Sequence, residues 1–496
     1  MIERYGNPKI YQIWSDESKT SRWQEAELAV CRAGAELQRV ALDVVENVCN
    51  ILMSIPINLE WWRKRELELR HDLAAFVEER RRHLPESQQS EFHGHGMTSY
   101  DAEDPAFVSM LKQSVDVVEP MLVTLEQVFR ELALKHRYTI MNGRTHGMEA
   151  ELQSFGKRVL TWIAEFRVAR AVLTHAKENL KYGKLSGAVG NYGGVDPELE
   201  REALAELGLE PFYGATQILP RILFKPLADS LEGITLVLAK IAWDIRLGSR
   251  SGRPIYQEPF GKDQKGSSAM PHKKNPITTE QIMGLARIIS GLCSGIKWNT
   301  ITTEERAIEQ SCVERVNWPD MFHTLIQALK GLTRVIAGLQ VFPDNMLLEV
   351  VDSRGTYASA IAKDVLAELC REHGITADEC YRAVQLAAFN AFELPEVWQG
   401  LRDSEIANFG AADAVLSGAA DLSRPRVVSI QTLIARGQLK SSPSLGIEQA
   451  DVTRWNGILR AVFLDSEALR RWNETFRPSY LLRNEHVLYE QVLGVE

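Results

Sequence analysis

Gly266-Ser267-Ser268-Ala269-Met270-Pro271-His272-Lys273-Lys274-Asn275-Pro276 is a polar loop that holds hydroxyls, an amide and two ammonium groups within eleven residues. Pro276 suits the first turn of a helix, because its missing N–H would have no partner there. Apolar residues then recur at steps of three and four, at Ile282, Leu285, Ile289, Leu292 and Ile296. This spacing predicts that the 266–276 loop leads into a buried helix.

The 266–276 loop also carries groups that suit reactions of anions. The start of a helix offers unpaired N–H groups and a partial positive charge, and Lys273 adds a full charge. An anion that gains charge during a reaction would be stabilised here, and the Ser267 hydroxyl could serve as a base. The other interpretation is a solvated loop that caps a helix, because Ser, Lys and Asn are ordinary loop residues. Composition alone leaves both interpretations open.

Helical periodicity extends far on both sides of this loop. Between residues 108 and 134, apolar side chains follow one another at steps of three and four for more than six turns, and residues 153–180, 227–247 and 321–339 are similar. Strand signals are scarce. The pattern therefore predicts an all-α protein built on a bundle of long helices. Apolar residues spread beyond a single stripe, so we also expect the helices to pack in an oligomer.

The pattern divides the chain into three helical domains. We expect an N-terminal helical domain over residues 1–105, a central long-helix bundle over 106–350 and a C-terminal helical domain over 351–496. The last boundary falls at Asp352-Ser353-Arg354-Gly355. Residues from about 400 to 455 are rich in Ala, Gly and Ser, which predicts loops and short helices there.

The totals exclude several classes of protein. A net charge of −9 and a pI near 5.8 over 496 residues argue against nucleic-acid binding and against a membrane-surface role. The six cysteines form no CxxC pair and no His-rich ligand spacing, so we expect no metal site and no disulfide framework. The N-terminus lacks an apolar signal region, and no apolar run reaches the roughly 18–20 residues of a membrane span. A cytoplasmic protein is the resulting expectation.

Four further motifs contain histidines, hydroxyls or an amide: Leu69-Arg70-His71-Asp72, Gly94-His95-Gly96-Met97-Thr98-Ser99, Gly143-Arg144-Thr145-His146-Gly147 and Thr216-Gln217. A lone histidine is more often structural than catalytic, although it can act as a general acid at neutral pH. Glycines with successive N–H groups near Thr98 suit an anion nest. On residue chemistry alone, each motif has a structural as well as a functional interpretation.

Together with the 266–276 loop, these motifs resemble the fumarase/aspartase superfamily in its adenylosuccinate lyase form. The resemblance implies a catalytic set of Ser267, His146, His71, Lys273 and Glu280. Ser267 would remove a proton beside a carboxylate, His146 would protonate the departing nitrogen, and His71 would assist it. The remaining motif residues would hold the substrate: Arg70, Asp72, Thr98, Ser99, Thr145, Gln217 and Asn275.

A second set of residues matches the positions that hold a ribose phosphate in that family: Arg4, Tyr5, Arg306, Ser311 and Arg315. The planar fork of arginine suits phosphate oxygens, so three arginines favour a phosphorylated, nucleotide-like substrate. The alternative is a salt-bridged surface, since Glu304, Glu305 and Glu314 are close in sequence.

The resemblance also implies the fold and the reaction. The central bundle would form a 20-helix core in a homotetramer whose active sites are shared between subunits. The expected reaction is a β-elimination that releases fumarate from an N-substituted succinate, without a cofactor or a metal. Adenylosuccinate and the succinylated aminoimidazole carboxamide ribotide of purine biosynthesis are the substrates that the family implies.

Several positions depart from the family pattern. Gly94 stands where the family has a histidine, so either a neighbouring histidine, His93 or His95, replaces it or the pocket has changed. Ile222 and Phe224 replace an aspartate and a histidine, and Glu309 and Gln310 also differ. The insert at about 400–455 either reshapes a site wall or an interface or is a neutral surface addition. These departures keep two alternatives open: a lyase that acts on a different substituted succinate, and a noncatalytic relative.

Overall fold

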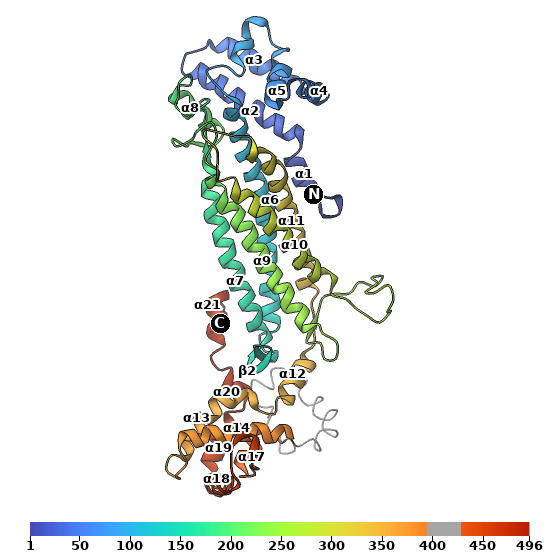
Figure 1. Ribbon diagram of the computed structural model, residues 1–496, viewed down its shortest axis with the longest axis vertical. Coiled ribbons are helices and arrows are strands. Elements are labelled where there is room, and N and C mark those ends of the chain that lie inside the picture. Colours follow the sequence, from blue (N-terminus) through green and yellow to red (C-terminus); the bar gives the residue numbers. More distant parts are fainter. Residues whose placement is uncertain (394–427, 496) are drawn as a thin grey trace. The chain divides into compact units, whose positions relative to one another are not determined.

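Figure 1 shows the computed structural model of the chain, which describes residues 1–393 and 428–495. The described residues are mainly helical, with three two-stranded sheets, so the all-α fold class is confirmed. Five helices are much longer than the rest: α6 (Ser99–Lys135), α7 (Phe155–Ala176), α9 (Lys225–Gly248), α10 (Ile277–Trp298) and α11 (Glu309–Ala337). They correspond to the five stretches whose periodicity predicted long helices.

Two compact units divide the chain, and each is made of segments that are separate in sequence. The first unit consists of Met1–Leu125, Glu165–Trp243 and Ile277–Arg334, and the second of Glu126–Ala164, Asp244–Pro276 and Val335–Glu496. Four of the five long helices pass from one unit to the other, which is why each unit draws on distant segments. The three consecutive domains expected from the sequence stay a prediction.

The N-terminal part of the first unit packs around aromatic side chains. It contains α1 (Pro8–Ile13), α2 (Asp16–Glu36), α3 (Leu42–Ser54), α4 (Leu59–Leu69) and α5 (Asp72–Arg81), and α8 (Pro197–Glu206) belongs to the same unit. Trp23 lies edge-on against Trp62 and Phe76, with ring centroids 6.2 and 5.5 Å away. All three are fully buried, so this cluster anchors the helices that carry His71 and Asp72.

No single helix among the described residues is long and apolar enough to cross a membrane. The pair α3 and α4, which is bent by 105°, has the length and composition of a membrane span, but only by these two criteria.

Long helices run side by side in the rest of the first unit (Figure 1). Asn317 of α11 donates to the Leu292 carbonyl of α10 at 2.8 Å, and Phe107 of α6 contacts Trp318 of α11. The apolar stripe of α9 is completely buried: Leu231, Ile234, Leu238, Ile241 and Ile245. Four of the five stripe residues predicted for α10 are buried as well, and Leu292 is half-buried. The helical periodicity therefore identified the core-facing sides correctly.

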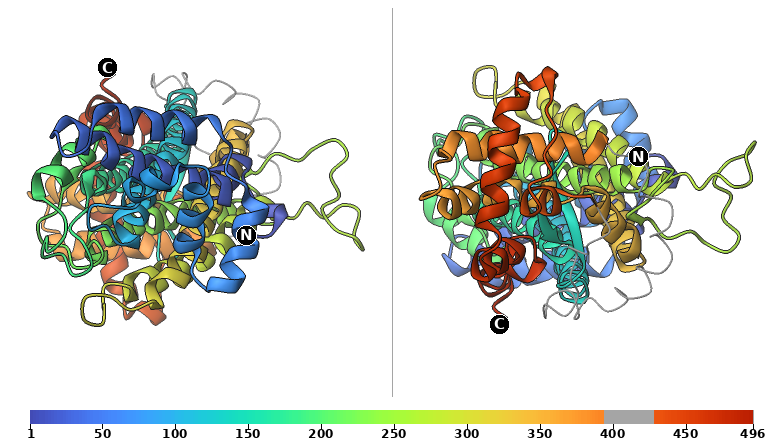
Figure 2. Two further views of the ribbon diagram at one scale, coloured as in Figure 1. Left: turned by 90° about the horizontal axis from the view of Figure 1, so that it is seen from above. Right: turned by 90° about the horizontal axis from the view of Figure 1, so that it is seen from below.

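The second unit combines the 266–276 loop, a hairpin and a C-terminal helical core. The hairpin pairs β1 (Ile140–Thr145) with β2 (Met148–Ser154), and a short pair joins β5 (Tyr256–Gln257) to β6 (Gln340–Val341). The remaining short pair, β3 (Tyr182–Gly183) with β4 (Glu210–Pro211), belongs to the first unit. The C-terminal helices are α12 (Pro343–Asp352), α13 (Ser359–Cys370), α14 (Ala377–Glu393), α17 (Ile430–Ala435), α18 (Gln449–Val462), α19 (Ser466–Glu474), α20 (Pro478–Leu481) and α21 (His486–Leu493). Figure 2 shows the 266–276 loop in yellow-green, reaching outward without helix or strand.

Part of the predicted insert lies inside this C-terminal core. Residues 400–427 fall outside the described residues, but Ile430, Ile434 and Trp455 are buried in the same apolar cluster as Trp472. The segment from residue 428 onward is therefore part of a core and not a surface addition, because its apolar side chains exclude water from the neighbouring helices.

Candidate active site

The 266–276 loop is closed on itself by its two ends. The Asn275 side chain donates to the Gly266 carbonyl at 2.7 Å. A Cβ placed on Gly266 would lie 2.0 Å from the Lys273 carbonyl oxygen, so only glycine fits where the ends meet. Within the closed loop, Ser267 Oγ accepts hydrogen bonds from the backbone N–H of Met270 at 3.1 Å and from that of Ala269 at 3.3 Å. Two donors therefore already point at the oxygen that would become negative if Ser267 lost its proton.

His146 lies at the tip of the β1–β2 hairpin and not in an irregular loop. Thr145 pairs with Met148, which leaves His146 and Gly147 as the two central residues of the turn, with φ of 53° and 79°. Positive φ at both positions is typical of the type I′ turns that fit the twist of a hairpin, and histidine tolerates such values better than most residues. His146 and Gly147 thus form the tight turn of the hairpin. Thr145 and His146 are both exposed.

His71 caps the N-terminus of α5. Its Nδ1 accepts a hydrogen bond from the backbone N–H of Ala74 at 3.3 Å. A neutral ring with an accepting Nδ1 carries its proton on Nε2, and Nε2 lies 3.4 Å from the Ser99 hydroxyl at the start of α6. The cap thus fixes both the tautomer and the direction of the ring. Arg70, which precedes it, ends α4 in the left-handed conformation with φ of 53°.

Asp72, next in sequence, is paired with Arg315 across the first unit. Its Oδ2 accepts from the Arg315 guanidinium at 2.6 Å, while its Oδ1 accepts from the backbone N–H of Leu73. Arg315 lines a pocket of about 330 Å³ together with Ser311, Tyr100 and Glu103. This pocket brings together two of the five residues predicted to bind phosphate.

Glu103 adds a carboxyl group that the sequence interpretation did not include. Burial, followed by the negative charge of Asp72, raises its pKa to about 8, although Arg306 and Arg315 oppose the shift. The neutral carboxylic acid therefore predominates at neutral pH, and as such it can donate a hydrogen bond to an anion in the pocket.

Gln217 and Arg306 contact each other directly. Arg306 donates to Gln217 Oε1 at 3.0 Å, and its guanidinium lies 4.0 Å from the centre of the Tyr100 ring. Stacking on tyrosine restricts the guanidinium plane, and the hydrogen bond orients the amide of Gln217. Two residues predicted to bind different parts of a substrate are thus neighbours. Glu309 is exposed at the start of α11 and does not line the pocket.

The N-terminal segment that carries Arg4 and Tyr5 is attached to α11. The Met1 ammonium lies 2.5 Å from Asp320, the Asn7 N–H donates to His323 at 2.9 Å, and Gln327 donates to the Gly6 carbonyl at 3.2 Å. These three α11 residues are spaced by three and four and so share one face. The N-terminal segment therefore lies along the helix that carries Ser311 and Arg315 in its first turns. Arg4 is exposed.

The catalytic set is divided between the two units. His71 and Glu280 belong to the first unit, together with Thr98, Ser99 and the predicted phosphate residues. His146 belongs to the second unit with Ser267, Lys273 and Asn275. Glu280, in the first turn of α10, and Lys273 are both exposed. Within the second unit, no described hydrogen bond joins His146 to the 266–276 loop.

His93 and His95 flank Gly94, and both rings are engaged by carboxylates. His93 Nδ1 lies 2.7 Å from the fully buried Glu27, and His95 lies 3.5 Å from Glu91. Burial lowers the pKa of His93, but the hydrogen bond and charge of Glu27 outweigh burial, so the net shift is upward. A Cβ at position 94 would lie 2.2 Å from the Ser90 carbonyl oxygen, which explains the glycine. His93 is therefore a structural partner of Glu27.

The sequence patterns did not indicate two buried ionic clusters that lie beside Gln217. Lys184 pairs with Asp101, and Arg221 pairs with both Asp104 and Glu314. Charged residues in otherwise apolar or glycine-rich sequence were the available signal, since a charge is buried only where it is paired. Two residues after Arg221 differ from the family pattern. Phe224 is buried, with its ring centroid 5.2 Å from that of Phe107, and Ile222 is half exposed.

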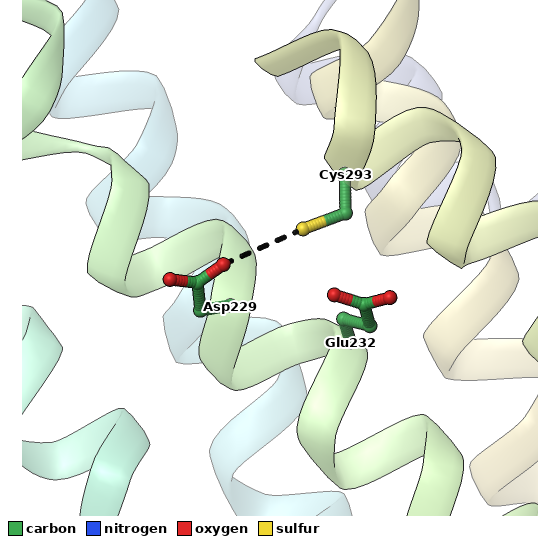
Figure 3. Close-up of side chains that lie close together, drawn as sticks. All are labelled: Asp229, Glu232 and Cys293. Atoms are coloured by element: carbon green, nitrogen blue, oxygen red, sulfur yellow. Dashed lines mark hydrogen bonds between the residues drawn. The ribbon is translucent and has the colours of Figure 1, made fainter. Parts of the chain in front are cut away.

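Asp229, Glu232 and Cys293 form a cluster whose ligand-type atoms are close enough to hold a metal ion (Figure 3). However, the Lys297 ammonium lies 3.1 Å from both carboxylates, and Lys225 lies 2.6 Å from Asp229. Two ammonium groups thus neutralise the two carboxylates and stand in the place of a cation. The cluster is explained as an ion-pair network between α9 and α10.

Comparisons with known proteins agree with the motifs. A family model described as a lyase matches residues 3–291. The adenylosuccinate lyase of Aquifex aeolicus is 35% identical over 411 residues, which are 82% of this chain and 93% of the relative. The adenylosuccinate lyase of Thermotoga maritima is 37% identical over 392 residues, which are 79% of this chain and 89% of that relative.

Solved structures show the same fold at lower identity. A fumarate lyase from Mesorhizobium sp. BNC1 superposes with a TM-score of 0.71 at 23% identity, over 92% of this chain and 98% of that one. The 3-carboxy-cis,cis-muconate lactonizing enzyme from Pseudomonas putida has a TM-score of 0.68 at 19% identity, over 97% of this chain and 98% of that one. With the matched loop, the histidine motifs and these relatives taken together, the chain belongs to the adenylosuccinate lyase family of carbon–nitrogen lyases within the fumarase/aspartase superfamily.

Proposed function

We propose that the protein cleaves adenylosuccinate to AMP and fumarate, and the succinylaminoimidazole carboxamide ribotide to its amide and fumarate, in cytoplasmic purine biosynthesis. The observation that carries the proposal is the closed 266–276 loop, in which two backbone N–H groups point at Ser267 Oγ. The names of the relatives support adenylosuccinate as a substrate. The alternative of a lyase for a different substituted succinate is not favoured by these relatives.

The reaction is a β-elimination that needs one base and one acid. Ser267, as an alkoxide, takes the proton beside a carboxylate of the succinyl group, and the electron pair moves into that carboxylate to give a dianion. Lys273, Asn275 and the loop N–H groups stabilise this charge, which exists only after proton loss. The C–N bond then breaks, its electrons pass to nitrogen, and His146 protonates the nitrogen. His71 assists the acid, and Glu280 orients nearby groups. No step requires a metal or an organic cofactor.

The substrate is held from both ends. Thr98 and Ser99, with Thr145, hold a succinyl carboxylate, and Gln217 grips the substrate through its amide. Arg70 and Asp72 hold the part of the substrate that lies beside His71. The pairing of Asp72 with Arg315 supports this proposal, because it holds the guanidinium beside Ser311 in the pocket. The phosphate is held by five residues: Arg4, Tyr5, Arg306, Ser311 and Arg315.

A homotetramer with shared active sites completes the proposal. His71, His146 and the 266–276 loop would come from different subunits, packed through the long helices. Exposed apolar side chains on α7 and α9 of the first unit support an interface there: Val168, Val172 and Leu236 are 68%, 49% and 48% exposed.

The direct test follows fumarate by its absorbance after purified enzyme is mixed with adenylosuccinate. Rapid fumarate formation is expected from the wild type, and none above background from Ser267→Ala. A tetramer of correct size that leaves adenylosuccinate unchanged would exclude this substrate. Other substituted succinates would then be tested in the same assay.

Mixing two inactive variants tests the shared site. Ser267→Ala and His146→Ala homotetramers are dissociated, mixed and reassembled. Hybrid tetramers contain some sites in which both residues are intact, so partial activity should return. Each variant treated alone is the control. Absence of recovery in confirmed hybrids would count against sites shared between subunits.

A further inference from the structure

Lys184 is a fully buried cation whose three donors all have partners. Its Nζ donates to Asp101 Oδ1 at 2.5 Å, to the Gln217 carbonyl at 3.0 Å and to the Gly187 carbonyl at 3.1 Å. Both Lys184 and Asp101 have side chains with no exposed surface. A lysine ammonium has three N–H donors, so none remains for a ligand. Whatever Lys184 does for the reaction, it does through its neighbours.

The neighbours belong to three segments of the first unit. Asp101 Oδ2 accepts from the backbone N–H of Thr98 at 2.8 Å, which fixes the start of α6. Its Oδ1 also accepts from the Gly187 N–H at 3.4 Å. The third contact of Lys184 is the backbone of Gln217, whose side chain is held by Arg306. One buried ion pair thus links the Thr98–Ser99 segment, the glycine turn at 184–187 and Gln217.

We propose that Lys184 is a positioning residue that holds Gln217 at a fixed distance from the Thr98–Ser99 segment. This inference rests on the proposed function, in which Gln217 and Thr98–Ser99 bind the same substrate. Their separation must then match the substrate, and a shift of about 1 Å in such a contact can cost on the order of 100-fold in rate. The buried ammonium sets the separation because its three acceptors come from all three segments.

Lys184→Arg is the first test variant, because it keeps the charge but cannot place a planar guanidinium on the same three acceptors. Lys184→Gln combined with Asp101→Asn is the second, because it removes both charges and leaves no unpaired ion in the core. Arg80→Lys is the matched control: Arg80 and Glu79 form another ion pair with no exposed surface, in the N-terminal core.

A double-mutant cycle with Gln217→Ala separates positioning from a general structural role. Lys184→Arg should lower kcat/KM for adenylosuccinate at least 10-fold in the wild-type background and less than 3-fold in the Gln217→Ala background, because the residue that it positions is then gone. Equal effects in the two backgrounds would overturn the proposal. Arg80→Lys should leave kcat/KM unchanged in both. If Lys184→Arg does not fold, the double variant takes its place in the cycle with the same criteria.

The wild-type rate distinguishes a failure of the proposed function from a failure of the role proposed for Lys184. Turnover of adenylosuccinate by the wild type together with equal Lys184→Arg effects in both backgrounds would leave the proposed function standing and exclude the role of Lys184. Absence of wild-type turnover would overturn the proposed function and this inference with it.

Discussion

Ser267 and Ser268 are adjacent hydroxyls that differ in what they contact. Ser267 Oγ accepts two backbone hydrogen bonds inside the closed loop, whereas Ser268 is exposed. Donors that already point at an oxygen stabilise its anion without reorganisation. The geometry therefore gives the two neighbouring hydroxyls different surroundings and favours Ser267 as the proposed base.

Ser267→Ala should lower kcat by about 100- to 10,000-fold, the range expected when a general base is removed. KM should change little, because the hydroxyl removes a proton and does not bind the ground state. Ser268→Ala is the control and should keep near-normal kcat. Steady-state fumarate formation measures both variants. Equal losses in the two would exclude Ser267 as the specific base.

Glu103 makes folding stability depend on pH. Its pKa is raised to about 8 in the folded protein, mainly by burial, whereas an ordinary glutamate titrates near 4.5. Between these values the folded protein binds more protons than the unfolded chain, so the free energy of unfolding should fall as pH rises from about 4.5 to 8. Glu103→Gln should flatten this fall. Urea unfolding at several pH values measures it, and parallel curves for the two proteins would contradict the assignment.

The 266–276 loop depends on the close approach of its own ends. Because a Cβ on Gly266 would meet the Lys273 backbone at 2.0 Å, Gly266→Ala should prevent closure and move Ser267 away from its two donors. We expect a loss of activity of at least 10-fold with an unchanged melting temperature, since the loop is not part of a core. Gly261→Ala, where the nearest atoms lie at 3.6 and 3.7 Å, should remain active.

Calorimetry and fumarate formation check the two glycine variants together. A Gly266→Ala enzyme with full activity would show that the closed loop is not required. Loss of activity in both variants would point to a general sensitivity of the 258–276 segment.

The α9 helix has a second apolar side that the core of the described first unit does not cover. Its buried stripe faces the other helices, while Leu236 remains 48% exposed and α7 adds Val168 and Val172. An apolar face of this kind is typical of helices that bury it in an oligomer. The proposed tetramer would cover these side chains.

Leu236→Asp should therefore dissociate the tetramer, because a carboxylate would be buried without a partner in the interface. Size-exclusion chromatography with light scattering measures the mass, and activity should be lost with the shared sites. Leu464→Asp is the control: Leu464 is 87% exposed and should tolerate the change. A Leu236→Asp protein that is still tetrameric would place the interface elsewhere.

The long helices could be predicted because their signal is local. Steps of three and four put apolar side chains on one side of a helix wherever the partner comes from, and the stripe of α9 is buried as expected. The hairpin at 140–154 was missed because polar Asn142, Arg144 and Thr145 give β1 no alternating pattern. The composition of the insert predicted loops and short helices but not a buried core, since the burial of Ile430 and Ile434 depends on residues distant in sequence.

The sequence by itself determined the helical class and the family and nominated the candidate catalytic residues, because periodicity and motifs are properties of short segments. Only the tertiary structure decided which charges are paired. Lys184 meets Asp101, Arg315 meets Asp72, and the charges of Arg306 and Arg315 act on Glu103, although long stretches of chain separate them. The energy of a charge depends on its burial and on what lies within a few ångströms, and neither quantity can be read from the order of residues.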